Sequence, residues 1–334
     1  MWCRDARLTR SRSAQAQAPS SKASAIFAIL GAANLGAWGW ALSEARNSPA
    51  VLGLAVLVYG LGLRHAFDAD HIAAIDNVTR NLTRGGVAPL AVGLWFALGH
   101  STIVALATAG AALAFGPAQK WIPAIRAFGG VAGSLISTSF LFAIAAANLD
   151  LARRLLHARA GRSQLAPSPA PTGPATAVLT SLLARVRRAP AMFAIGLLFG
   201  LGFDTAAEIA LIGISAAHAA RSPSIMLYPA LFAAGMSLAD TLDGVLMARA
   251  CRWAQAEPRR RLDYNLTVTV ISAGAALAIG AVQLAKLLTS QLQLRGTISS
   301  LATSLLDHWA MIGAMMTAAL LGWLAWATRR RVGV

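Results

Sequence analysis

The stretch that decides the fold is Arg64-His65-Ala66-Phe67-Asp68-Ala69-Asp70-His71, which lies within an apolar window at 50–78. Five of its eight side chains are ionisable. A charge at the centre of a membrane-spanning helix costs about 2.5–3.5 kcal/mol on insertion scales, so five such groups together indicate function rather than packing. Two imidazoles and two carboxylates are also ligands that divalent transition metals accept. The stretch therefore predicts a metal site inside a membrane.

The rest of the chain has the composition of a polytopic membrane protein. Of its 334 residues 57% are hydrophobic and 13% are charged, and the mean hydropathy is +0.59. Each long apolar window can supply the ~20 residues that cross the hydrocarbon layer. We expect an all-α integral membrane protein with eight transmembrane helices, at about 24–43, 50–78, 87–115, 127–148, 190–217, 225–248, 266–288 and 304–327.

The net charge of +16 has an uneven distribution along the chain. Of the Lys and Arg residues, 22 lie in the N-terminal segment, three of the connections (79–86, 149–189 and 249–263) and the C-terminus, against six in the alternate connections. By the positive-inside rule, both termini are predicted to be cytoplasmic. The basicity is thus a topology signal, and we expect a multi-pass protein of the cell (inner) membrane, with the lipid bilayer and no nucleic acid as partner.

The domain organisation follows from these windows and from one long linker. The linker contains four prolines between 167 and 174 and is flanked by arginines, which predicts a flexible connection. We expect a disordered basic cytoplasmic tail at 1–23, helices one to four at 24–148, the cytoplasmic linker at 149–189 and helices five to eight at 190–328. The two groups of four helices are expected to form one membrane domain.

Two segments repeat at the same spacing. Phe67-Asp68 matches Phe203-Asp204, and 96–101 matches 232–237, both at an offset of 136 residues. A shift of three helices reverses the direction across the membrane, so helices two and three would be related to five and six as an inverted repeat. Many secondary transporters are built in this way. Chance similarity between helices rich in Ala, Gly and Phe is the alternative.

Acidic groups dominate inside the apolar windows. These windows contain seven carboxylates and one arginine, whereas the connections between them are basic. Such carboxylates must be protonated, paired or neutralised by a bound cation, and an anion pathway would have the opposite sign. At 100° per residue on a straight helix, His65, Asp68 and His71 share one face. Asp70 lies on the opposite side, where we expect it to fix another helix or an unwound turn.

Four segments carry a family resemblance. They are 64–72, with His65 followed by Asp70-His71, and then 96–102, 201–209 and 235–244. Over about 24–327 the chain resembles the nickel/cobalt transporter (NiCoT) family of single-component permeases. The resemblance implies eight helices and high-affinity uptake of Ni²⁺ or Co²⁺, which are transported ions and not resident cofactors. No phosphate-binding loop accompanies these motifs, so no ATPase subunit is evident.

On this interpretation the functional residues fall into two sets. Imidazole suits Ni²⁺ and Co²⁺, whereas Mg²⁺ and Ca²⁺ prefer oxygen ligands. We expect the metal to be held by His65, Asp68, Asp70, His71 and His100. A second set is expected to orient these ligands or relay protons, and it comprises Arg64, Asp76, Asp204, Glu208, Asp240 and Asp243.

Two alternatives remain open at this point. Export of the same ions, or transport of another divalent metal, would use similar ligands, although 149–189 holds only one histidine, His157. A membrane-embedded lipid-modifying enzyme is the remote alternative, because His65-x4-Asp70 and Asp240-x2-Asp243 resemble parts of acyltransferase and phosphotransferase motifs. Both motifs are incomplete, so we expect no enzyme.

Overall fold

The computed structural model describes residues 5–46, 48–84, 87–113, 122–159, 188–201, 208, 211–215, 224–255, 258–293, 300, 301 and 304. All regular elements within these ranges are helices, as predicted. In chain order they are α1 (Asp5–Ala45), α2 (Ala50–Ala66), α3 (Ala69–Arg84), α4 (Val92–Leu113), α5 (Ile122–Arg159), the 3-10 turn η2 (Ala189–Ala191), α7 (Met192–Gly200), α9 (Leu227–Gln255) and α10 (Pro258–Gln291).

Five of these helices are long and apolar enough to cross a membrane. At 1.5 Å per residue, about 20 residues span the ~30 Å hydrocarbon layer. The chain is therefore a helical, multi-pass membrane protein. The five candidate spans coincide with predicted windows and are Ala23–Ala45, Val92–Gly110, Gly130–His157, Leu227–Arg252 and Leu266–Gln291.

The remaining predicted windows are described less completely. The window at 50–78 corresponds to α2 and α3, which form a sixth span if the bent pair is taken as one. The short apolar helix α7 lies within 190–217, whereas 304–327 lies outside the described residues except for residue 304. Five helices exceed their windows, because α1 begins at Asp5, α3 continues to Arg84, α5 continues to Arg159, α9 continues to Gln255 and α10 begins at Pro258.

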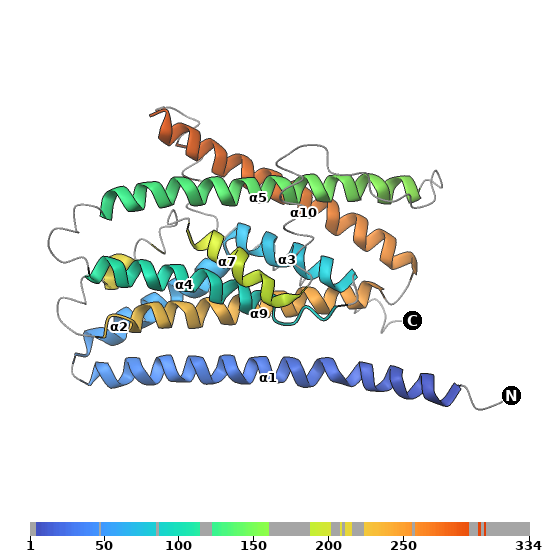
Figure 1. Cartoon of the computed structure of the whole chain (residues 1–334), viewed down its shortest axis with the longest axis horizontal. Coiled ribbons are helices and arrows are strands. Elements are labelled where there is room, and N and C mark those ends of the chain that lie inside the picture. The colour runs from blue at the N-terminus through green and yellow to red at the C-terminus, as the bar shows by residue number, and fades with distance from the viewer. Residues whose placement is uncertain are drawn as a thin grey trace.

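The helices are arranged in layers (Figure 1). α1 lies along one side and packs on α9 and α2, while α5 and α10 pair along the opposite side. The shorter α2, α3, α4 and α7 lie between them with α9. Each side of this middle layer has its own apolar core, and α4 contributes to both through the adjacent Phe96 and Ala97. The helices that carry the predicted site residues therefore lie in the middle of the bundle, with an apolar core on each side.

A break divides the helix that carries the opening stretch. α2 ends at Ala66 and α3 begins at Ala69, with an angle of 52° between them. At the break the N–H of Phe67 donates to Arg64 O and the N–H of Asp68 donates to His65 O, which are tighter i to i+3 bonds. The expectation of one straight helix through 50–78 is therefore wrong. Discontinuous helices of this kind expose backbone ends near a transporter's binding site.

Glycines let the central helices approach closely. A Cβ built on Gly62 of α2 would overlap the backbone oxygen of Phe232 on α9, and one on Gly196 of α7 would overlap that of Phe96 on α4. Small residues at such crossings are the usual device for tight helix packing in membranes. The close crossings fix the height at which α2, α4, α7 and α9 present their side chains to one another.

Candidate metal centre

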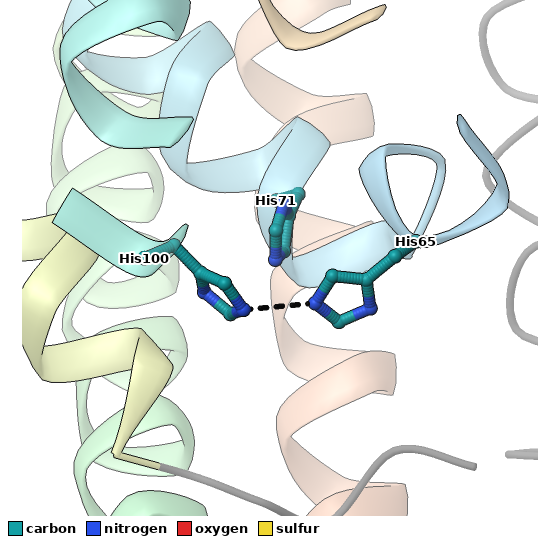
Figure 2. A group of neighbouring side chains, drawn as sticks. All are labelled: His65, His71 and His100. Atoms are coloured by element: carbon teal, nitrogen blue, oxygen red, sulfur yellow. Dashed lines mark hydrogen bonds between the residues drawn. The ribbon is translucent and has the colours of Figure 1, made fainter. Parts of the chain in front are cut away.

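Three buried histidines from three helices point toward one another (Figure 2). His65 lies in the last turn of α2, His71 in the first turn of α3 and His100 in the middle of α4. They are 1%, 1% and 2% exposed, and each offers a ring nitrogen within 4.8 Å of the others. The break between α2 and α3 turns His65 and His71 toward the same point, with their ring centroids 4.5 Å apart.

The closest approach joins His65 and His100. Their Nε2 atoms are 3.0 Å apart, and Glu208 Oε1 lies 2.9 Å from His100 Nε2 and 3.9 Å from His65 Nε2. Facing ring nitrogens at this distance need a proton or a cation to share. With metal–nitrogen bonds near 2.0–2.1 Å, two neighbouring ligands of one ion are about 3 Å apart. The two imidazoles and the Glu208 carboxylate thus have the spacing of ligands to one ion.

The other ring nitrogens of two histidines face carboxylates. Asp68 Oδ2 lies 2.8 Å from His65 Nδ1, so His65 can donate from Nδ1 and keep the Nε2 lone pair toward His100. Asp240 Oδ1 lies 3.6 Å from His71 Nδ1. Asp68 is 5% exposed and Asp240 is fully buried. A carboxylate behind a ligating imidazole fixes its tautomer and raises its basicity.

Asp70 faces away from this group. Its Oδ1 accepts the N–H of His71, and its Oδ2 lies within hydrogen-bonding distance of Ser137 Oγ on α5 (3.4 Å) and Gln283 Nε2 on α10 (3.5 Å). Gln283 Oε1 in turn accepts from the hydroxyls of Ser137 and Thr138. The structure therefore places Asp70 as an anchor of the first turn of α3 to the α5–α10 layer.

The other predicted residues are spread around the centre. Arg64 is half-buried in the last turn of α2, next to His65. Asp76 lies further along α3 and is half-buried, and Asp243 lies further along α9 and is buried. Asp204 lies outside the described residues. Of the eleven predicted residues, the structure brings together His65, Asp68, His71, His100, Glu208 and Asp240.

Some polar residues near the centre were missed from sequence. Arg80 was counted with the basic connection at 79–86, but α3 continues to Arg84 and Arg80 is only 3% exposed. Its placement in a connecting turn is therefore wrong. The missed signal was its spacing of four residues from Asp76, which puts both on one helix face. Gln283 and Ser137 were also missed, although each is a polar side chain within an apolar window.

Comparison with known proteins assigns the chain to a family. A family model described as "High-affinity nickel-transport protein" matches residues 51–329. The chain belongs to this nickel-transport family. The resemblance inferred from the four motifs is thereby confirmed.

Relatives in the curated proteins extend over most of the chain. The high-affinity nickel transport protein of Cupriavidus necator is 42% identical over 306 residues, 88% of this chain and 87% of the relative. The hydrogenase nickel incorporation protein HupN of Bradyrhizobium diazoefficiens is 41% identical, covering 95% of this chain and 85% of the relative. The cobalt transport protein NhlF of Rhodococcus rhodochrous is 38% identical, covering 72% and 71% respectively. No solved structure matches the chain.

Membership of the nickel-transport family settles one alternative. The family and two of these three relatives are named as transporters, not as enzymes. The chain is therefore a metal-transport protein, and the lipid-modifying enzyme is excluded.

Proposed function

We propose that the chain is a secondary permease that imports Ni²⁺, Co²⁺ or both across the cytoplasmic (inner) membrane. The observation that carries the proposal is the convergence of three buried imidazoles, from α2, α3 and α4, in the middle of the bundle. Imidazole is a good ligand for Ni²⁺ and Co²⁺. The names of the relatives, which include nickel and cobalt transport proteins, support the choice of these ions.

In the proposed centre His65 and His100 bind the ion through Nε2, and His71 and the Glu208 carboxylate complete the ligand set. Asp68 holds the His65 ring in the binding orientation. Three buried carboxylates near the imidazoles, those of Asp68, Glu208 and Asp240, offset the charge of a divalent ion. Ligands must be deprotonated to bind, so ion binding and proton release are coupled. We infer no ATP-driven step and no ATPase subunit.

We also propose eight spans, cytoplasmic termini and an inverted repeat. Two matching crossings support the repeat. The overlap of Gly62 with Phe232 on α2 and α9 has its counterpart in that of Gly196 with Phe96 on α7 and α4. The two glycines are 134 residues apart in the chain, and the two phenylalanines are 136 residues apart. Each crossing pairs one helix of the first half of the chain with one helix of the second half. Exchanging the two halves turns one crossing into the other.

Uptake of radioactive Ni²⁺ and Co²⁺ by a host lacking its own transporters tests the function. Wild-type cells are expected to accumulate the ions, and the double variant His65→Ala/His71→Ala is expected to fall to background because two ligands are gone. His157→Ala, an exposed histidine on α5, is the matched control and keeps full uptake.

Two outcomes would contradict this proposal. Uptake that survives in the double variant, with equal amounts of protein in the membrane, would show that His65 and His71 do not form the transport site. Lower metal content in wild-type cells than in empty cells would reverse the direction and favour export.

A further inference from the structure

A line of buried polar atoms runs between α3 and α9, beginning beside the imidazoles. Most buried side-chain nitrogen and oxygen atoms that lack a hydrogen-bond partner among the described residues lie on these two helices. Burying such atoms without partners is unfavourable, so their concentration marks a place where another polar species is needed. Among the residues with such atoms are His71, Asp76, Asn77, Thr79 and Arg80 on α3 and Asp240, Thr241 and Asp243 on α9.

Arg80 is the positive charge in this line. It is 3% exposed, and its Nε and both Nη atoms have no hydrogen-bond partner within the described part of the chain. A buried guanidinium needs a compensating negative charge. Asp76 lies four residues earlier on the same face of α3, a spacing at which oppositely charged side chains are neighbours.

Asp243 adds a second carboxylate from α9. A Cβ on the adjacent Gly244 would lie 3.4 Å from Ile75 Cγ2 and 3.9 Å from Thr79 Oγ1, so this turn of α9 packs directly on α3. Asp243 is 8% exposed, and its Oδ2 has no hydrogen-bond partner among the described residues. Two carboxylates and one guanidinium are therefore carried by the contact between α3 and α9.

We propose that Asp76 and Asp243 form a second divalent-cation site, and that the Arg80 guanidinium offsets one of its two negative charges while no metal is bound there. The inference rests on the proposed function, because the cation is the transported ion on its way to or from the imidazoles. The path between the two sites is short. His71 Nδ1 and Asp240 Oδ1 are 3.6 Å apart, and Asp243 lies one turn further along α9.

The donor chemistry explains why two sites would serve transport. Carboxylate, hydroxyl and amide oxygens bind divalent cations that keep part of their water, whereas imidazoles hold Ni²⁺ more selectively. An ion that leaves the imidazoles enters a site with weaker ligands, from which it dissociates more readily. Arg80 competes for the same carboxylates, so it limits how tightly they hold the metal and offsets part of their charge after release.

Binding of Mn²⁺, which prefers oxygen ligands, to the purified full-length protein tests the site. Electron paramagnetic resonance of free Mn²⁺ gives the affinity. Arg80→Gln is expected to tighten Mn²⁺ binding about tenfold or more, because the competing charge is removed. Adding Asp76→Asn and Asp243→Asn is expected to abolish the gain. Arg154→Gln, which removes a half-buried arginine paired with Asp150 on α5, is the matched control and leaves Mn²⁺ binding unchanged.

An unchanged affinity for Mn²⁺ in Arg80→Gln would overturn the proposal. A gain in Mn²⁺ affinity that survives the loss of both carboxylates would overturn it as well. A second measurement does not depend on the stability of the Arg80 variant. In Asp243→Asn, Ni²⁺ binding is expected to stay within about twofold of wild type while uptake falls about tenfold or more, since the imidazoles are intact but the second site is not. Normal uptake in this variant would overturn the second site, whereas failure of the proposed function would appear as uptake that survives loss of His65 and His71.

Discussion

At the scale of single residues, the orientation of His65 depends on Asp68. The carboxylate lies 2.8 Å from Nδ1, in a buried position, and this contact directs Nε2 toward His100 and Glu208. Asp68 therefore acts behind the imidazole. The sequence predicted it as a member of the ligand set, and the geometry gives it a positioning role.

Replacing Asp68 by asparagine tests that role. Asp68→Asn removes the charge behind His65, so the affinity for Ni²⁺, measured by calorimetry on purified protein, is expected to weaken about 10- to 100-fold. Asp150→Asn on α5, whose side chain is 53% exposed, is the matched control and keeps the wild-type affinity. An equal affinity for Ni²⁺ in Asp68→Asn and wild type would show that Asp68 does not position His65.

On a straight helix that turns by 100° per residue, the sequence placed Asp70 opposite His65 and His71, although it also counted Asp70 among the metal ligands. It could not predict the partners, since Ser137 and Gln283 are 67 and 213 residues away in the chain. Such pairings depend on how α5 and α10 pack on α3, which no local pattern encodes.

At the scale of helices, the crossing of α2 and α9 depends on the absence of a side chain at Gly62. A methyl group there would overlap the backbone of Phe232, which cannot move aside like a side chain. The neighbouring Gly60, on the same helix, has no atom within 4 Å of its Cβ position.

Gly62→Ala is therefore expected to destabilise the protein by about 1–3 kcal/mol, the usual range for overpacking. Gly60→Ala is the matched control, and it is expected to be neutral or slightly stabilising because alanine favours a helix over glycine. Unfolding of purified protein by a denaturing detergent, followed by tryptophan fluorescence, measures both variants. Equal stability of the two would show that the close crossing does not exist.

The break between α2 and α3 marks the limit of prediction at this scale. The residues around the break form one apolar window, and the polar residues among them were singled out as the predicted site. The bend of 52° was not foreseen, because periodicity assumes a continuous helix. The bend gives His65 and His71 different helix axes and lets them meet His100.

At the scale of the whole molecule, hydropathy predicted the helical membrane class and the positions of most described spans. Charge was less reliable, as Arg80 shows: a count of basic residues near span ends does not separate a topology signal from a buried arginine. The acidic interior was visible in the sequence, whereas its division into an imidazole centre and a line of carboxylates required the packing of α3 against α9.

X-ray absorption spectroscopy of Ni²⁺ bound to the purified protein tests the central claim most directly. The account predicts nickel surrounded by nitrogen and oxygen with the scattering pattern of several imidazoles, and loss of that pattern in His65→Ala/His71→Ala. A nickel environment of oxygen alone, or a spectrum unchanged in the double variant, would contradict it.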